Sequence, residues 1–358
     1  MPAGIEDVAA YAGVSTATVS RALRGLPNVS DATRRKVMEA AEALDYAMSP
    51  SASRLASGTT RSISVVVPYV GRWFFGQVLE GIEGVLREAG YDVLLFVLPD
   101  DDAQEEFFER MPLKRRVDAV IVLTLAMTSD QDERLRQLGL PMATVGDPLA
   151  GVFSVGIDDA SAARAATNHL INLGHTRIAM IGGEIHGLSR FTAPIERQRG
   201  YREAMAEADL EVLAGYEVDG EFTVPGGASA MGHLMSLPEA PTAVFAQSDE
   251  MAAGAIQAMR KMGLHCPEDV SIVGFDDHEL ASILELTTVS QPVQEQGKLA
   301  ARHILGALAG KELDAQARLQ VPTRLIVRSS TCPPRATPSP RGSAGSLPRS
   351  RPTTGEKK

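Results

Sequence analysis

The chain has 358 residues, of which 44% are hydrophobic and 22% charged, and its formal net charge is −10. This length exceeds what one small domain needs and favours a small domain joined to a larger body. The sequence contains neither a secretion signal nor an apolar run of membrane length, so we expect a cytoplasmic protein that does not contact membranes. Cys266 and Cys332 lie far apart and form no CxxC pair, which favours a reducing compartment over a disulfide framework.

The charge is unevenly distributed along the chain. Residues 1–61 carry one net positive charge and residues 335–358 carry five, so the middle of the chain carries −16. An acidic body repels nucleic acid, which leaves the first sixty or so residues to provide a local basic surface, and the basic tail can add weak nonspecific affinity for DNA. The overall pI of about 5.3 therefore does not exclude binding to nucleic acid.

A glycine turn separates the first two predicted helices. Val8, Ala9 and Ala12 form the apolar face of the first helix, and Gly13 can adopt the positive φ that a tight turn between helices requires. Ser15 then offers an N-cap hydroxyl to the second helix. This order of features predicts a helix-turn-helix, although the helix pattern alone also fits a plain α-hairpin.

The second predicted helix, residues 15–24, has one apolar and one polar face. Val19, Ala22 and Leu23 fall on the apolar face. The opposite side is short, polar and basic, and it holds Thr16, Ala17, Ser20, Arg21 and Arg24.

A third helix is predicted to begin at Ser30 and Asp31. Val37, Ala41 and Leu44 follow at helical spacing, so three small helices can close one small core.

The motifs of this region resemble the DNA-binding headpiece of the lactose repressor (LacI/GalR) family. The motifs are IEDVA, AGVS, TVSR and VSDATRRKV, and they cover residues 5–37 almost without gaps. The resemblance implies a transcriptional regulator, in most cases a repressor, that binds a palindromic operator in double-stranded DNA.

The resemblance also implies DNA contacts for individual side chains. The positions that match Thr16, Ala17 and Arg21 face base edges, where arginine can donate two hydrogen bonds to guanine and a methyl group suits thymine. Hydroxyl groups on phosphates fix the register without identifying a base. The positions expected to contact phosphates, or to assist beside them, are Ser15, Ser20, Thr33 and Asn28.

A second DNA-binding element is predicted in residues 49–60. Residues 50–56 can form one or two helical turns with proline near the start. By resemblance this is the hinge helix, which pairs with that of a second copy in the minor groove and inserts a leucine between base steps, here Leu55. Met48-Ser49 and Ser53-Arg54 depart from the family's pattern, and a plain linker is the alternative.

Between residues 61 and 332, short β-branched runs alternate with amphipathic stretches. We predict strands at residues 63–67, 93–97, 119–123, 178–181, 243–245 and 270–273. We predict helices at residues 77–88, 161–173 and 251–262. Apolar runs of this kind fit an α/β fold with doubly wound parallel sheets that are covered on both faces.

Residues 62–330 resemble the periplasmic-binding-protein-like core of the same family, in which a small ligand binds between two lobes. The motifs are ATNHL, LGHTRI, SDEMA and VGFDD. The expected domains are a headpiece of residues 1–48, a hinge of 49–60, a core of 61–332 and a disordered tail of 333–358. Within the core we expect lobe 1 to comprise about 62–160 and 291–320, and lobe 2 about 161–289 and 321–332.

Candidate effector-binding residues follow the strands of this core, because ligands of open α/β sheets bind beyond the carboxyl ends of the strands. Asp276 follows a strand predicted to end at residues 273–274. Arg197 is expected to begin a helix, where a cation is unfavourable, and the matching arginine of the family holds effector hydroxyls or carboxylates. The full set is Phe75, Asp147, Arg197, Ser248, Asp249, Asp276 and Gln291.

Two of these candidates have an ordinary structural alternative of equal weight. Asp249 opens a predicted helix and fits a helix cap equally well. Phe75 belongs to an aromatic stripe of a kind that is more often part of a core.

The sequence gives no sign of an enzyme. The seven histidines lack a metal-ligand spacing such as HExxH, and the acidic run of residues 276–279 has no nucleophile motif beside it. We expect neither a metal nor another cofactor. A homodimer is expected, because a palindromic site needs a two-fold protein.

The family's commonest effector is a sugar. Three alternatives are a nucleobase corepressor, an activator output, and a ligand-binding protein without a regulatory role.

Overall fold

The computed structural model describes residues 3–23, 26–46, 59–183, 191–311, 314 and 317–335. The chain divides into two compact units. Unit 1 comprises Met1–Gly156 and Val293–Leu319, and unit 2 comprises Ile157–Pro292 and Gln320–Lys358. Among the described residues, no helix is long and apolar enough to cross a membrane.

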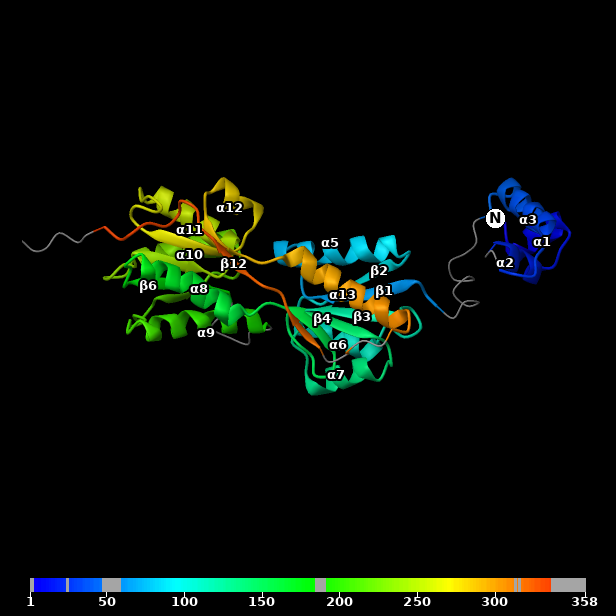
Figure 1. Ribbon diagram of the computed structural model, residues 1–358, viewed down its shortest axis with the longest axis horizontal. Helices are drawn as coiled ribbons and strands as arrows, with labels where there is room; N and C mark the ends of the chain where they lie inside the picture. Colours follow the sequence, from blue (N-terminus) through cyan, green and yellow to red (C-terminus); the bar gives the residue numbers. More distant parts are fainter. Residues whose placement is uncertain are drawn as a thin grey trace, which may run out of the picture. The chain divides into compact units, whose positions relative to one another are not determined.

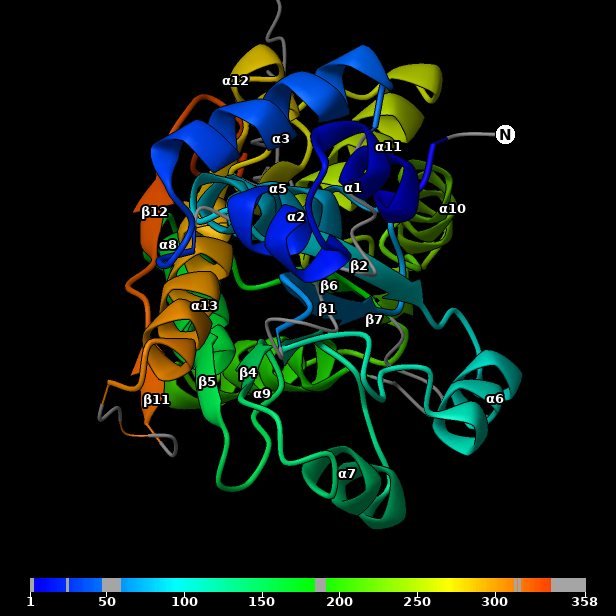
Figure 2. The ribbon, with the colours of Figure 1, turned by 90° about the vertical axis from the view of Figure 1, so that its right-hand side faces the viewer.

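Three short helices form the headpiece, as predicted (Figures 1 and 2). They are α1 (Ile5–Ala12), α2 (Thr16–Leu23) and α3 (Asp31–Ala43). Gly13 adopts a φ of 68° at the end of α1, and the Ser30 hydroxyl accepts a hydrogen bond from the Thr33 backbone N–H at the start of α3. The buried core of the headpiece is Val8, Ala9, Val19, Ala22, Val37, Ala40 and Ala41.

The core of unit 1 is a six-stranded sheet in the order β11-β5-β4-β3-β1-β2. The strands are β1 (Ser62–Val67), β2 (Asp92–Val97), β3 (Ala119–Leu123), β4 (Met142–Val145), β5 (Phe153–Gly156) and β11 (Arg318–Gln320). The helices are α5 (Trp73–Glu88), α6 (Asp101–Arg110), α7 (Ser129–Arg136) and α13 (Val293–Leu308). Figure 1 shows α5 and α13 on one face of the sheet and α6 and α7 on the other.

Unit 2 contains a second six-stranded sheet, in the order β12-β10-β9-β8-β6-β7. The strands are β6 (Ile178–Gly182), β7 (Glu217–Asp219), β8 (Ala243–Ala246), β9 (Ser271–Asp276), β10 (Thr287–Ser290) and β12 (Arg324–Ile326). The helices are α8 (Asp159–Asn172), α9 (Thr192–Glu207), α10 (Val224–Met235), α11 (Asp249–Lys261) and α12 (Glu279–Ile283).

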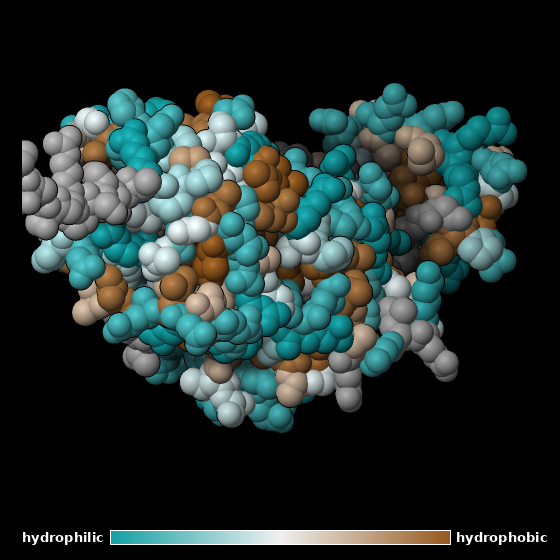
Figure 3. All heavy atoms as spheres, turned by 60° about the vertical axis from the view of Figure 1, so that its left-hand side comes forward, coloured by the Kyte–Doolittle hydropathy of each residue, from teal (hydrophilic) through white to brown (hydrophobic). Residues whose placement is uncertain are grey.

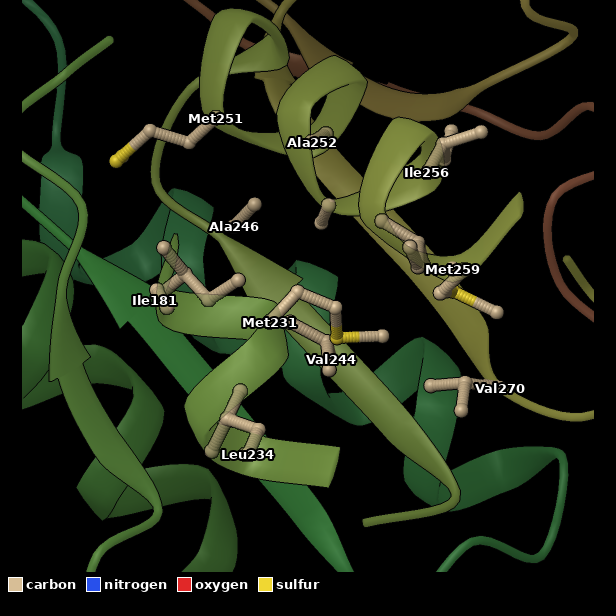
Figure 4. Packing of buried hydrophobic residues seen from close by; sticks show 14 of the residues in the cluster. Ile181, Met231, Leu234, Val244, Ala246, Met251, Ala252, Ile256, Met259 and Val270 are labelled. Carbon is tan, nitrogen blue, oxygen red and sulfur yellow. The ribbon is translucent and has the colours of Figure 1, made fainter. Parts of the chain in front are cut away.

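Helices cover both faces of the unit 2 sheet. One hydrophobic cluster joins α10 and α11 to the sheet, and Figure 4 shows Met231 and Met259 beside Val244 of β8. A second cluster, around Tyr201 and Phe245, lies on the face that α8 and α9 cover. Because both faces are buried, the strands read as continuous apolar runs, which is why they could be predicted.

Every strand and helix predicted for the core is present, with small differences at the ends. α5, α8 and α11 each begin two to four residues before the predicted position, because their first turns hold residues such as Asp159 and Asp249 that do not follow the apolar pattern. β9 continues to Asp276 instead of ending at residue 274. Of the four-residue strands only β8 was predicted; β4, β5 and β10 were not, and neither were the three-residue strands β7, β11 and β12.

The unit boundaries differ from the expected lobes by a few residues. Asp159 belongs to unit 2, since α8 begins there. Gln291 also belongs to unit 2, not to lobe 1. Residues 333–335, expected to belong to the disordered tail, are placed in the structure, where Arg335 forms an ion pair with Asp269 at 2.6 Å. The predicted hinge helix, with Leu55, lies outside the described residues.

Glycines allow the helices to approach closely in pairs. A Cβ atom at Gly200 of α9 would lie 2.1 Å from the Ala160 carbonyl oxygen of α8. The same holds for Gly81 of α5, whose Cβ atom would lie 2.2 Å from the Gln294 carbonyl oxygen of α13. These contacts are with backbone atoms, which cannot rotate away as a side chain can.

We predict that Gly200→Ala lowers the free energy of unfolding by about 1–2 kcal/mol, because the overpacking cost exceeds the gain in helix propensity. Gly232 of α10 is the matched control, since nothing lies within 4 Å of a Cβ atom there. Gly232→Ala should be neutral or stabilising by about 0.5–1 kcal/mol. Urea-induced unfolding measures both values, and equal effects of the two substitutions would show that the α8–α9 contact is not tight.

Candidate DNA-binding and effector sites

One side of α2 is exposed and carries the side chains predicted to contact bases. Thr16, Ala17 and Arg21 are exposed, whereas Val19 and Ala22 are buried in the headpiece core. The exposed side chains are small except for the arginine, so a neighbouring surface can approach this face of the helix closely. A helix of this kind fits the major groove of DNA.

The predicted phosphate contacts lie near helix N-termini. The Ser15 hydroxyl accepts a hydrogen bond from the Thr18 backbone N–H at 3.2 Å, and Thr33 lies in the first turn of α3. Helix N-termini favour anions such as phosphate. Ser20 is half-buried on α2, and Asn28 is exposed in the turn before α3 with a φ of 68°.

Arg34 ties the second helix to the third, a role that sequence reasoning missed. Its guanidinium donates to the carbonyl oxygens of Ala22 at 3.0 Å and of Leu26 at 2.9 Å. The helix pattern placed Arg34 in a basic run with Arg35 and Lys36, both of which are exposed. The residue spacing held no signal for this structural role, because it depends on where the chain passes after α2.

Arg197 is the centre of a polar site in unit 2. It is 6% exposed and is the sixth residue of α9, not the first as expected. Its Nε donates to Asp159 Oδ1 at 2.8 Å and its Nη1 donates to the Gln247 carbonyl oxygen at 2.6 Å. The guanidinium carbon lies 3.7 Å from the centre of the Phe275 ring. Among the described residues, no group accepts a hydrogen bond from Nη2.

Asp276 lies beside Arg197 at the carboxyl end of β9. Its Oδ1 accepts a hydrogen bond from Gln291 Nε2 at 2.6 Å and lies 3.9 Å from Arg197 Nη1. Burial raises the pKa of the Asp276 carboxyl to about 7, although Arg197 and Gln291 both act to lower it. Asp276 has a φ of 111°, which is unusual for a residue with a side chain. Its second carboxylate oxygen accepts no hydrogen bond from a described residue.

The structure therefore brings Arg197, Asp276 and Gln291 together at the carboxyl ends of neighbouring strands of the unit 2 sheet. Two residues absent from the predicted set complete this cluster. Asp159 pairs with the arginine, and Gln247 supplies a carbonyl to it while its side chain accepts from the Gly183 backbone N–H at 3.1 Å. Burial raises the pKa of the Asp159 carboxyl, and Arg197 opposes that shift. Gln247 lies two residues after the strand predicted at 243–245, and that position is a signal that could have found it.

Asp249 has a structural role in place of the predicted ligand contact. It is fully buried, and its two carboxylate oxygens accept hydrogen bonds from the Thr288 hydroxyl at 2.7 Å and the His278 backbone N–H at 2.8 Å. Burial raises its pKa well above the usual value for aspartate. Ser248 is the N-cap of α11, where its hydroxyl accepts from the Met251 backbone N–H. With no exposed surface, Asp249 cannot touch a ligand in this structure.

The other two predicted effector residues belong to unit 1. Phe75 lies in the first turn of α5, is 6% exposed and packs edge-on against Tyr69 and Phe74. Asp147 is half-buried and follows β4 by two residues. Their contact with an effector remains a prediction.

Within the described ranges, no group of three or more His, Cys, Asp or Glu side chains could hold a metal ion. Cys266 and Cys332 are both free thiols.

Comparisons with known proteins bear on both parts of the chain. Residues 4–49 match the family model "Bacterial regulatory proteins, lacI family", and residues 167–331 match "Periplasmic binding protein-like domain". A helix-turn-helix joined to a ligand-binding domain defines a ligand-responsive transcriptional regulator.

Individual relatives agree with this class. The HTH-type transcriptional repressor CytR of Escherichia coli (strain K12) is 36% identical over 334 residues, which cover 92% of this chain and 96% of CytR. The structure of the transcriptional regulator CelR in complex with cellobiose has a TM-score of 0.68 and 32% identity and covers 92% of this chain and 99% of CelR. The lac repressor dimer bound to operator and the anti-inducer ONPF has the same fold, with a TM-score of 0.82, 24% identity and coverage of 93% of this chain and all of that one.

The chain belongs to the LacI family of bacterial transcriptional regulators. The relatives named here are regulators of transcription and not enzymes.

The raised pKa of Asp276 predicts a specific pH dependence of stability. Because the folded state binds this proton more tightly than the unfolded state, stability falls as pH rises from about 4 to 7, by up to about 1.4 kcal/mol per pH unit. Asp276→Asn should remove this slope in urea unfolding between pH 5 and 7.5. Asp158→Asn is the control, since Asp158 caps α8 and its pKa is lowered, which confines its effect to more acidic pH. Parallel curves for wild type and Asp276→Asn would contradict the assignment.

Proposed function

We propose that this protein is a homodimeric repressor in the cytoplasm that binds a palindromic operator and is controlled by a sugar. The observation that carries the effector proposal is the buried polar cluster around Arg197, in which a donor and an acceptor have no hydrogen-bond partner among the described residues. The family supplies the regulatory role, and the finer assignments below rest on the geometry of the headpiece and of unit 2.

The headpiece supports sequence-specific contact by α2. Arg21 is exposed and long enough to donate two hydrogen bonds to a guanine, while Thr16 and Ala17 present methyl groups that suit thymine. Ser15, Ser20 and Thr33 are proposed to contact phosphates, and Asn28 assists beside them.

The cluster in unit 2 suits a ligand with neighbouring hydroxyl groups. Among the residues that the structure describes, Arg197 Nη2 and the second oxygen of Asp276 have no hydrogen-bond partner, and the two side chains lie beside each other. One ligand hydroxyl can accept a hydrogen bond from Arg197 Nη2, and a neighbouring hydroxyl can donate one to Asp276. Charge-assisted hydrogen bonds of this kind are strong. Gln291 orients the carboxylate through its 2.6 Å hydrogen bond. A sugar supplies such hydroxyls, and the similar regulator CelR was solved in complex with cellobiose.

A two-fold dimer fits both the operator and the surface of the chain. A palindrome presents the same half-site twice, so a two-fold protein matches it. The similar lac repressor structure is described as a dimer bound to operator. Ile283 of unit 2 is 74% exposed, and Val70 and Val97 of unit 1 are 44% and 41% exposed. The face drawn in Figure 3 is mainly hydrophilic, with hydrophobic residues in small groups.

A ligand-binding protein without a regulatory role is not favoured. Such a protein has no use for the helix-turn-helix, and the relatives match over the headpiece as well as the core.

We predict that Arg21→Ala weakens binding to the operator by about 1–3 kcal/mol and relaxes selectivity at one base pair. Arg35→Ala is the matched control, because this exposed arginine of α3 is expected to weaken binding to all sequences alike. Equilibrium titrations on operator and on random duplexes compare the two variants. Equal losses on both duplexes for Arg21→Ala would refute the base contact.

The proposed function is tested by selecting DNA fragments with the full-length protein at near-physiological salt, with and without a panel of sugars and nucleosides. We expect one palindrome to be enriched, because nonspecific binding fades at this salt concentration. We expect one sugar to abolish that enrichment. Recovery of no palindrome would overturn operator binding. Release of the DNA by a nucleoside and by no sugar would overturn the proposal that the effector is a sugar. A compound that strengthens binding to the palindrome would be a corepressor.

A further inference from the structure

The start of the unit 1 core is held by one carboxylate. Asp118 Oδ1 accepts hydrogen bonds from the Thr60 backbone N–H at 2.7 Å and from the Thr60 hydroxyl at 2.9 Å. Asp118 Oδ2 accepts from the Arg61 backbone N–H at 2.9 Å. Three donors from two adjacent residues thus converge on a side chain 57 and 58 residues away in the sequence.

The backbone around this carboxylate is fixed from the other strands as well. The Arg61 carbonyl accepts from the Asp92 backbone N–H of β2, and the Ser62 carbonyl accepts from the Asp118 backbone N–H just before β3. Since β1 lies between β2 and β3, the backbone at the start of β1 is hydrogen-bonded on both sides. Arg61 adopts a φ of 51°, a costly conformation for arginine that persists only where its surroundings enforce it.

The residues that form these hydrogen bonds lie outside the hydrophobic core of unit 1. Thr60 and Arg61 precede β1 and bury no apolar side chain in the sheet. Their hydrogen bonds instead fix the position and direction of the chain where it enters the core from the headpiece. β1 continues from these two fixed residues into the sheet, and its six residues extend about 20 Å to its carboxyl end.

We propose that Asp118 is a positioning residue for operator binding. Its carboxylate anchors Thr60 and Arg61, where the chain arrives from the headpiece, on the unit 1 sheet, so that each headpiece of a dimer is presented at a defined position. The inference rests on the proposed dimeric operator function. Length alone cannot carry this effect, because extending even a fully flexible connection by three residues lowers the effective concentration of a tethered headpiece by less than about twofold. The effect on operator binding must therefore come from the fixed direction and the rigidity of residues 60 and 61.

The test compares the full-length wild type with Asp118→Ala on the selected palindrome and on a duplex with one half-site. We expect affinity for the palindrome to fall about tenfold or more, with half-site affinity within about twofold of wild type, because only the palindrome requires both headpieces to be positioned. Thr60→Val should act in the same direction, and Thr60→Ser should restore binding, since serine keeps the hydroxyl. Asp100→Ala is the control, because Asp100 caps α6 through the Ala103 backbone N–H and forms no hydrogen bond with Thr60 or Arg61.

Amide hydrogen exchange at Thr60 and Arg61 tests the anchor without DNA. Asp118→Ala should raise both exchange rates about tenfold or more, and unchanged rates would overturn the proposal. Faster exchange with an unchanged ratio of palindrome to half-site affinity would also overturn it, because the contact would then be purely structural. If wild type binds the palindrome no more tightly than the half-site, the dimeric function fails. The anchor is then judged by headpiece tumbling in NMR relaxation, which must become faster in Asp118→Ala.

Discussion

The buried guanidinium of Arg197 is the interaction on which the organisation of unit 2 depends. It joins α9 to Asp159 at the start of α8, to the Gln247 carbonyl after β8 and to the Phe275 ring in β9. A buried cation without such partners is strongly unfavourable, so these groups must be in place before the charge is tolerated. The ligand cluster is therefore assembled by the same contacts that hold the helices to the sheet, and a ligand finds its polar partners already oriented.

Asp249 and Asp276 are both buried, and they illustrate how hydrogen-bond partners assign different roles to the same residue type. Asp249 uses both oxygens inside the fold, where they hold β10 and the loop after β9. In Asp276 one oxygen accepts from Gln291, and the other accepts no hydrogen bond within the described ranges. Sequence patterns place both residues at strand or helix ends and cannot distinguish them, because the difference lies in Thr288 and His278, which come from elsewhere in the chain.

Features that depend on neighbouring residues could be predicted, whereas those that depend on tertiary contacts could not. The positive φ of Gly13 and the cap at Ser30 follow from local backbone requirements, and both were found from the sequence. The long apolar strands were also found, because both faces of each sheet are buried. Asp159 was missed because its partner lies 38 residues away on α9. The hydroxyl of Ser248 gave no hint whether it caps a helix or faces a ligand.

Both units are built from separated stretches of the chain, and this has a consequence for biosynthesis. Unit 1 is completed by Val293–Leu319, and unit 2 by the segment that begins at Gln320. The headpiece needs only local contacts within the first 46 residues. On a ribosome that makes the chain from its N-terminus, the headpiece can fold long before either unit is complete. A chain that terminates early in the core thus retains an intact DNA-reading module without the part that responds to ligand.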